Sequence, residues 1–232
     1  MARKKQKHKK KRNAAPKTKR ASPARFYRGI GDKGWSNSNY FTYSSSSPAF
    51  RRWLSAELGE RPRDILSIGC GNGELETYLS IDGHRLTGLD PAQPMLKRAI
   101  RNGLKRGVGG DARALPFAAA SFDMVIFPES IGHVPLPEVF AEAKRVLKKR
   151  GALIVTTYAS HVGVHSHYRK YRFADLAPAA EAAGLAVEAQ RYLAAKRHSI
   201  DEAPTDAKAT LLYFRARATA DETSRPRRRQ RG

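Results

Sequence analysis

A glycine-rich turn between two apolar patterns limits what this chain of 232 residues can fold into. In the stretch ILSIGCGNGELETYL, residues 65–79, the apolar residues of a short strand precede the turn, and apolar residues at helical spacing follow it. Gly69, Gly71 and Gly73 lie between the two patterns. A strand, a glycine turn and a helix in this order predict a ligand that approaches the backbone at the carboxyl end of a strand. Glycines that serve only the turn are the alternative.

Strand and helix patterns alternate along most of the chain. The sequence predicts strands at 63–68, 84–89, 107–110, 123–127 and 152–157, and helices at 48–60, 74–79, 94–101 and 136–149. A helix at 173–183 then precedes strands at 185–193 and 209–218, with no clear crossover helix between these two. The alternation predicts an α/β fold with a doubly wound, mostly parallel sheet, and the direct connection predicts an antiparallel last strand.

The net charge of +23 is concentrated in two segments. Residues 1–25 hold 12 Lys and Arg, residues 224–232 hold 5, and neither segment holds an acid, so the rest of the chain carries about +6. We expect residues 1–25 and 221–232 to be basic disordered tails, because like charges repel and no apolar face is present to bury. One interpretation is non-specific contact with nucleic acid or ribosomes, and the other is a solvated tail.

Composition also bears on the compartment and the domain count. The single cysteine, Cys70, excludes an internal disulfide and favours a reducing, cytoplasmic compartment. No apolar run reaches the roughly 18 residues of a membrane-spanning helix. With 41% hydrophobic residues, the chain can form one core. We expect one α/β domain over residues 61–220, preceded by a helical or lid segment over residues 26–60.

The spacing of the glycines limits which class of ligand the turn can bind. The turn has the sequence G-C-G-N-G, whereas a dinucleotide-binding turn has G-x-G-x-x-G. At the position of the third glycine in the dinucleotide pattern, this chain has Glu74. The lysine of a phosphate-binding loop is also missing from the turn. The ligand is therefore expected to carry no pyrophosphate.

Two carboxylates follow strands and add to this interpretation. Asp90 ends the second strand, where a carboxylate can accept both hydroxyls of a ribose, and its alternative role is a helix N-cap. Asp111 follows the third strand, where it can accept from an exocyclic amine, and its alternative role is that of a surface turn residue. Together with the glycine turn, the two acids indicate a nucleoside without a diphosphate.

At this point the residues resemble a known family. The motifs ILSIGCGNG, LTGLDPAQPMLKRA, GDARALPFAAASFDMVIF, IGHV and RVLKKRGALIV, in this order, are similar to those of class I S-adenosylmethionine-dependent methyltransferases, in the branch of ubiquinone and menaquinone biosynthesis. The resemblance covers residues 61–218, about two thirds of the chain, and says nothing of the tails. It implies a Rossmann-like, seven-stranded sheet and S-adenosylmethionine (AdoMet) as the cofactor.

The resemblance also implies roles for individual residues. Gly69, Cys70, Gly71 and Gly73 would lie against the methionine part of AdoMet. Asp90 would hold the ribose, and Pro91 would pack beside the adenine. Asp111 and Ala112 would face the adenine, and Phe127 and Pro128 would line the side of the methyl group.

Candidate catalytic residues follow the fourth strand. Transfer of the methyl group needs a base only where the acceptor must lose a proton, and Glu129 and His133, in FPESIGHV, stand where a base is expected. The resemblance also allows a structural role for His133. The sequence N/D-P-P-Y of many enzymes that methylate base amines is absent, and residues 127–130 stand in its place, which counts against such an acceptor.

The loop after the fifth strand holds three histidines, His161, His165 and His167. A metal site is one interpretation, but no cysteine or carboxylate adjoins them, and a substrate-side loop without metal is the expectation. Tyr168 and Tyr171 alternate with the basic residues 169, 170 and 172, a mixture that suits nucleic-acid stacking or an exposed loop.

The sequence therefore predicts an AdoMet-dependent methyltransferase that acts on a small organic acceptor. Two alternatives stay open at this point. The first is methylation of RNA or of a ribosome-associated macromolecule, which the basic tails favour. The second is an RNA-binding module that has the fold without the activity.

Overall fold

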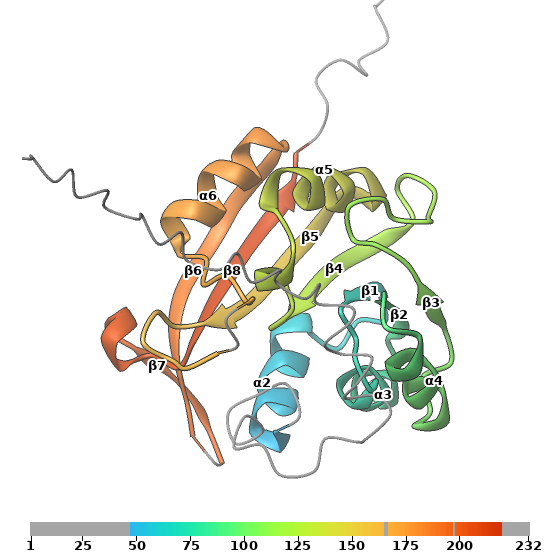
Figure 1. Cartoon of the computed structure of the whole chain (residues 1–232), viewed down its shortest axis with the longest axis horizontal. Helices are drawn as coiled ribbons and strands as arrows, with labels where there is room; N and C mark the ends of the chain where they lie inside the picture. Colours follow the sequence, from blue (N-terminus) through green and yellow to red (C-terminus); the bar gives the residue numbers. More distant parts are fainter. Residues whose placement is uncertain (1–46, 165–166, 197, 220–232) are drawn as a thin grey trace, which may run out of the picture.

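An eight-stranded sheet organises the part of the chain that the computed structural model describes, residues 47–164, 167–196 and 198–219 (Figure 1). The strands are β1 (Asp64–Ile68), β2 (Arg85–Asp90), β3 (Gly107–Gly109), β4 (Phe122–Pro128), β5 (Leu147–Tyr158), β6 (Leu185–Ala195), β7 (Ile200–Ala203) and β8 (Leu211–Ala218). The helices are α2 (Pro48–Leu58), α3 (Glu74–Ile81), α4 (Gln93–Arg101), α5 (Leu136–Val146) and α6 (Phe173–Ala182), with short 3-10 turns η2 (Ile131–His133) and η3 (Asp206–Lys208). The predicted tails, most of the predicted lid segment and His165 lie outside the described residues.

The strand order is β3-β2-β1-β4-β5-β8-β6-β7. Strands β1 to β5 are mutually parallel, whereas β8 runs antiparallel to both β5 and β6. The predicted Rossmann-like, mostly parallel sheet with an antiparallel last strand is therefore confirmed. In such a sheet the carboxyl ends of β1, β2 and β4 meet at one edge, beside the order reversal between β1 and β4.

The sheet has one strand more than the resemblance implied. Residues 196–208, for which no crossover helix was predicted, contain β7, which pairs antiparallel with β6 from Tyr192↔Ala203 to Ala195↔Ile200. A strand pair can be joined by a short connection only when its strands are antiparallel. The β6–β7 hairpin therefore extends the sheet by an edge strand, and the chain reaches β8 through the short 3-10 turn η3, without a crossover α-helix.

The predicted end of the helix after the fourth strand was wrong. That helix was expected to reach Lys149 and to close at Gly151, but α5 ends at Val146, and Leu147 already pairs with Phe122 of β4. The ladder shifts register between Phe122 and Met124, and regular pairing resumes at Ala152. Pairing with the neighbouring strand overrides the helical preference of the basic residues that follow Val146.

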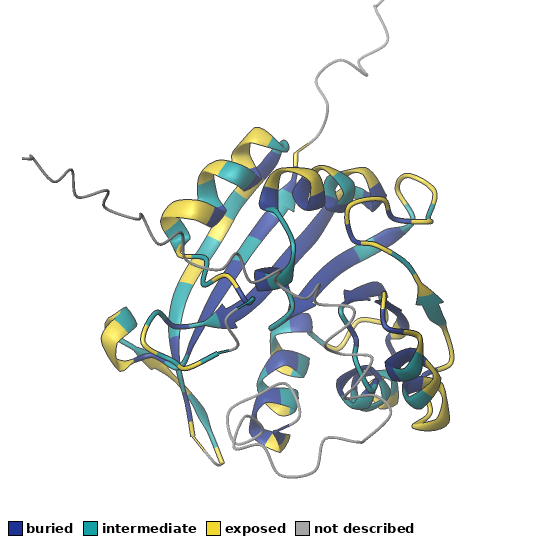
Figure 2. Cartoon of the chain, in the orientation of Figure 1, coloured by how far each residue is buried: buried dark blue, intermediate teal, exposed yellow. Residues whose placement is uncertain are grey.

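Helices cover both faces of the sheet. On one face, α5 and α6 bury apolar residues such as Val139, Phe140 and Leu176, and on the other, α2, α3 and α4 bury residues such as Leu54 and Leu79 (Figure 1). Figure 2 shows the central strands buried and the outward sides of α5 and α6 exposed. The strand predicted at 123–127 is buried on both faces, because its residues alternate between the two apolar clusters. No helix in the described part of the chain is long and apolar enough to cross a membrane.

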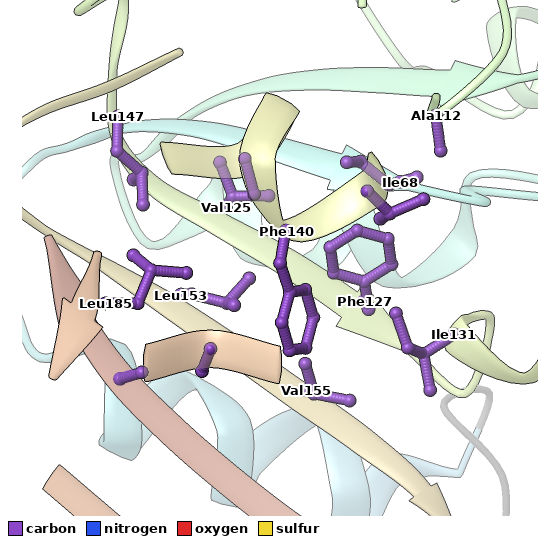
Figure 3. Packing of buried hydrophobic residues seen from close by; sticks show 14 of the residues in the cluster. Ile68, Ala112, Val125, Phe127, Ile131, Phe140, Leu147, Leu153, Val155 and Leu185 are labelled. Atoms are coloured by element: carbon purple, nitrogen blue, oxygen red, sulfur yellow. The ribbon is translucent and has the colours of Figure 1, made fainter. Parts of the chain in front are cut away.

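Phe140 lies at the centre of the apolar cluster between the sheet and helices α5 and α6. Figure 3 shows it amid other residues of this cluster, among them Phe127 and Val155. Its side chain has 0% exposure, and its ring stacks on that of Phe214 with 6.4 Å between centroids and 10° between planes. This contact fixes α5, and with it the loop between β4 and α5, against the sheet.

We expect Phe140→Ala to lower the free energy of unfolding by about 3–5 kcal/mol, because a large buried ring is replaced by a cavity. Ile81→Ala, at a position that is 79% exposed, is the control and should change stability by less than about 0.5 kcal/mol. Chemical denaturation of both variants measures the difference. Equal losses in the two variants would contradict this account of the core.

Candidate active site

The glycine turn is bonded to the end of the neighbouring strand. The amides of Gly69 and Cys70 both donate to the carbonyl oxygen of Leu89, at 2.7 and 3.2 Å, and the amide of Gly73 donates to that of Cys70 at 3.0 Å. Because Leu89 precedes Asp90 at the end of β2, these bonds hold the turn beside the candidate ribose-binding carboxylate. The turn then passes directly into α3, with Gly73 as the N-cap.

The three glycines of the turn have different surroundings. All three have positive φ, at 77° for Gly69, 53° for Gly71 and 74° for Gly73. A Cβ atom would lie 2.4 Å from Cβ of Ser130 if added to Gly69, and 2.7 Å from Cβ of Ala99 if added to Gly73. At Gly71 the only described atom within 4 Å would be Cε of Met95, at 3.6 Å. Gly69 and Gly73 are therefore required by the packing of the protein itself, whereas the described residues leave the backbone at Gly71 open to a ligand.

Asp90 is buried and its carboxylate links the turn to β2. Oδ2 accepts from the amide of Gly71 at 2.9 Å, and Oδ1 accepts from that of Ala92 at 2.8 Å. Burial raises the pKa of this carboxyl, and the two amide bonds oppose that shift. A carboxylate offers about four acceptor positions, so each oxygen keeps one for a further donor. Asp90 can thus serve the local turn and a bound diol together.

The other predicted cofactor contacts lie in varied surroundings. The Cys70 side chain is buried against Gly88, and burial raises the pKa of its thiol. Pro91 is exposed, whereas Pro128 and Ala112 are buried. The Phe127 ring is also buried, in the apolar cluster under α5 (Figure 3).

Asp111 lies at the surface and is occupied by its own neighbour. Its Oδ1 accepts from the backbone amide of Arg113 at 2.9 Å, and the Arg113 guanidinium pairs with the same carboxylate. This hydrogen bond with Arg113 is the main reason that the pKa of Asp111 is lowered. The geometry corresponds to the surface-turn alternative, and an adenine amine would share the carboxylate with Arg113.

The loop after β4 abuts the glycine turn. The hydroxyl of Ser130 donates to the carbonyl oxygen of Ile68, one residue before Gly69. Glu129 has a positive φ of 58°, unusual for a residue with a side chain, and its amide donates to Thr156 of β5 at 3.0 Å. Strain of this kind gathers at functional sites, where the surrounding structure enforces it. The proposed base and the glycine turn therefore share one edge of the sheet.

Aromatic and histidine side chains gather around the candidate bases. The hydroxyl of Tyr158 donates to Oε2 of Glu129 at 2.9 Å. The ring of His133 lies 4.9 Å from that of Tyr168, nearly perpendicular at 87°, and 5.7 Å from that of His167. The hydroxyl of Tyr168 is 2.8 Å from that of Thr157 on β5. The structure thus assembles a polar aromatic cluster, and its β5 members follow no motif that sequence analysis singled out.

Two of the three histidines of the loop after β5, His161 and His167, lie in the described part of the chain. Within residues 47–164, 167–196 and 198–219, no group of three or more His, Cys, Asp or Glu side chains is arranged to hold a metal ion. His167 instead faces His133, and His165 lies outside the described residues. The segment 167–172 packs on η2, where the amide of Arg169 donates to the carbonyl oxygen of Gly132 at 2.8 Å.

Sequence analysis overlooked one carboxylate beside the turn. Glu76, in the first turn of α3, is 1% exposed and accepts from the hydroxyl of Ser67 at 2.5 Å. Its only signal in the sequence is its spacing, one residue after Leu75 on a helix that packs against the sheet. A charged residue on the edge of such an apolar stripe is usually exposed, so the pattern alone did not indicate burial.

The chain is similar to known methyltransferases. Residues 66–155 match the family described as Methyltransferase domain. A ubiquinone biosynthesis O-methyltransferase of Bordetella avium is 30% identical over 166 residues, which cover 60% of this chain and 69% of that protein. The matched region therefore spans about two thirds of the length of this relative.

Two solved structures show the same fold. One is the Burkholderia thailandensis 1,6-didemethyltoxoflavin-N1-methyltransferase with bound 1,6-didemethyltoxoflavin and S-adenosylhomocysteine, with a TM-score of 0.64 and 22% identity, covering 85% of this chain and 87% of that one. The other is the [4+2]-cyclase SpnF, with a TM-score of 0.65 and 18% identity, covering 85% and 95%. At these identities the likeness concerns the fold, which hosts more than one reaction.

The packing around the turn predicts that its glycines differ in their effect on stability. Gly69→Ala adds a methyl group that overlaps Ser130, on top of the cost of a side chain at positive φ, so we expect a loss of about 3 kcal/mol or more. Gly71→Ala meets no close atom, so we expect only the conformational cost of about 1–2 kcal/mol. Urea denaturation of both variants measures the order, and a larger loss in Gly71→Ala would contradict it.

Proposed function

This chain belongs to the S-adenosylmethionine-dependent methyltransferases, and we propose that it transfers the methyl group to a hydroxyl oxygen of a small organic acceptor. The relative from Bordetella avium is an O-methyltransferase, which supports oxygen as the acceptor atom. The observation that carries the proposal is the bond between Ser130 and Ile68, because it brings the loop of the candidate bases against the glycine turn. Cofactor side and acceptor side then meet at one edge of the sheet.

The residues at this edge fit AdoMet. Gly71 offers open backbone with positive φ, and Asp90 keeps one acceptor position on each oxygen after its bonds to Gly71 and Ala92. We propose that residues 69–73 hold the methionine part and Asp90 the ribose. Pro91, Asp111, Ala112, Phe127 and Pro128 complete the proposed cofactor contacts. When bound, AdoMet supplies an activated methyl group.

The chain's own residues would orient the acceptor and remove its proton. A hydroxyl becomes a good nucleophile only as its proton leaves, so a base within hydrogen-bond reach accelerates the transfer. We propose Glu129 and His133 as the candidates, because both lie on the loop after β4. Tyr158 donates to Glu129 at 2.9 Å and fixes the direction of its carboxylate, and the ring of Tyr168 packs on His133. The surrounding rings would hold a flat acceptor and exclude water.

The basic segments contribute a separate proposal. The relatives named above give no support to RNA or a ribosome-associated molecule as the acceptor. The 17 cations of residues 1–25 and 224–232 still favour non-specific contact with nucleic acid, because each neutralised phosphate releases a counterion. We also propose a cytoplasmic location, where the single, buried thiol of Cys70 would stay reduced.

Asp90 provides the direct test of the cofactor site. Asp90→Ala should weaken S-adenosylhomocysteine by about 1.5–3 kcal/mol, because bonds to a charged acceptor are lost. It should also lower stability by about 1–3 kcal/mol, because the amides of Gly71 and Ala92 lose their acceptor. Calorimetry and denaturation measure the two effects, and Asp201→Ala on β7 is the distant control. Unchanged affinity in Asp90→Ala would place the ribose elsewhere.

The acceptor class can be tested by transfer of tritiated methyl groups from AdoMet into a cell extract, followed by separation into RNA, protein and small molecules. We expect the label in the small-molecule fraction, at the same rate for the full chain and for a chain without residues 1–25 and 224–232. The shortened chain should lose its salt-dependent binding to polyanions. Label in RNA, with a raised KM after shortening, would overturn the proposed acceptor.

A further inference from the structure

The side chain of Glu76 is buried beside the glycine turn without a full set of partners. It is 1% exposed, and Oε1 accepts from the hydroxyl of Ser67 on β1. Oε2 has no hydrogen-bond partner among the described residues. A buried carboxylate oxygen without a donor loses its hydration and gains no bond in return, whereas an exposed oxygen is bonded to water, so the position calls for an explanation.

Charged groups on β2 and α2 act on the carboxyl group of Glu76. Asp90 at the end of β2 adds negative charge, and Arg51 on α2 adds positive charge. The Arg51 guanidinium, however, is already paired with Glu74 at 2.7 Å. The Cys70 thiol in the turn is also close enough for Glu76 and Asp90 to raise its pKa. Two buried carboxylates and a buried thiol thus lie within electrostatic range of one another, and the cation that acts on Glu76 is paired with Glu74.

Burial raises the pKa of Glu76 to about 7, with Asp90 adding to the shift and the bond from Ser67 opposing it. Below this pH the ligand-free side chain is mostly neutral. The stability gained from the neutral form is present below the ordinary value of 4.5 and is lost as pH rises through about 7. A cation placed beside Oε2 would reverse the balance and favour the carboxylate.

We propose that the carboxylate of Glu76 is the anionic partner of the α-ammonium group of AdoMet, with Oε2 as the accepting atom. This inference rests on the proposed location of the methionine part at residues 69–73. Helix α3 begins directly after that turn (Figure 1), and Glu76 is its third residue. Helical side chains lean toward the N-terminus of their helix. The side chain is thus directed toward the turn, and its free oxygen is the acceptor that a buried ammonium group needs.

A role of Glu76 in binding the α-ammonium group should affect only ligands that carry the amino-acid group. S-adenosylhomocysteine keeps the α-ammonium group, whereas 5′-methylthioadenosine lacks it. Glu76→Gln retains the size of the side chain and removes its charge. By calorimetry with the full chain at pH 8, we expect it to weaken S-adenosylhomocysteine at least about tenfold and to leave 5′-methylthioadenosine unchanged within about twofold. Asp82→Asn, at an exposed acid that caps the other end of α3, is the matched control and should have little effect.

Two further readouts separate this role from a purely structural one. At pH 6 the wild-type chain should release protons on binding S-adenosylhomocysteine, detected from heats in two buffers of different ionisation enthalpy, and Glu76→Gln should release fewer. Thermal unfolding at pH 8 should show Glu76→Gln at least as stable as the wild type, because a buried charge is removed. Weak binding then cannot be attributed to misfolding.

The outcomes distinguish this inference from the function it rests on. If wild-type chain binds S-adenosylhomocysteine and Glu76→Gln binds it equally well, the role of Glu76 is wrong and the cofactor site stands. If the variant binds both ligands more weakly by the same factor, Glu76 supports the turn as a whole, and the inference is also wrong. If the wild-type chain binds neither ligand, the proposed cofactor site fails together with the inference.

Discussion

The candidate site depends on one set of hydrogen bonds, which hold the glycine turn against the neighbouring segments. The amides of Gly69 and Cys70 share the carbonyl oxygen of Leu89, and the hydroxyl of Ser130 reaches the carbonyl oxygen of Ile68. These bonds join the ends of β1, β2 and β4, which lie far apart in the sequence. A side chain at Gly69 would separate them, since its Cβ would lie 2.4 Å from that of Ser130. The turn is therefore the joint between the two halves of the candidate site, in addition to its proposed contact with the cofactor.

Negative charge is the second organising feature. Asp90 and Glu76 are both buried at this joint, and burial raises the pKa of each. Amides satisfy both oxygens of Asp90, whereas a hydroxyl satisfies only one oxygen of Glu76. A ligand that brings positive charge and hydroxyl groups complements such a site. This complementarity is a physical reason for the family's cofactor to bind here that does not depend on the resemblance.

The acceptor side is built differently. Glu129 has a strained backbone, and its side chain is fixed by Tyr158 from β5, while the rings of Tyr168 and His167 pack around His133. These residues come from the loop after β4, from β5 and from the segment before α6, so the length and composition of the loops would decide the shape of the proposed acceptor site. Such loops vary among enzymes that share a scaffold, which is why the fold alone does not identify the acceptor.

By itself, the sequence determined the parallel sheet and the antiparallel last strand, and it predicted a cofactor site at the glycine turn. These follow from local patterns: alternating apolar segments, the G-x-G-x-G turn and an acid at the end of the next strand. Only the tertiary structure decided which glycine is open to a ligand, because the distances from Gly69 to Ser130 and from Gly73 to Ala99 are contacts between distant segments. It also decided that α5 ends at Val146 and that β7 extends the sheet, since strand pairing overrides local preference. Glu76 shows the same limit, because its burial against Ser67 depends on how α3 packs on β1, which no spacing of residues encodes.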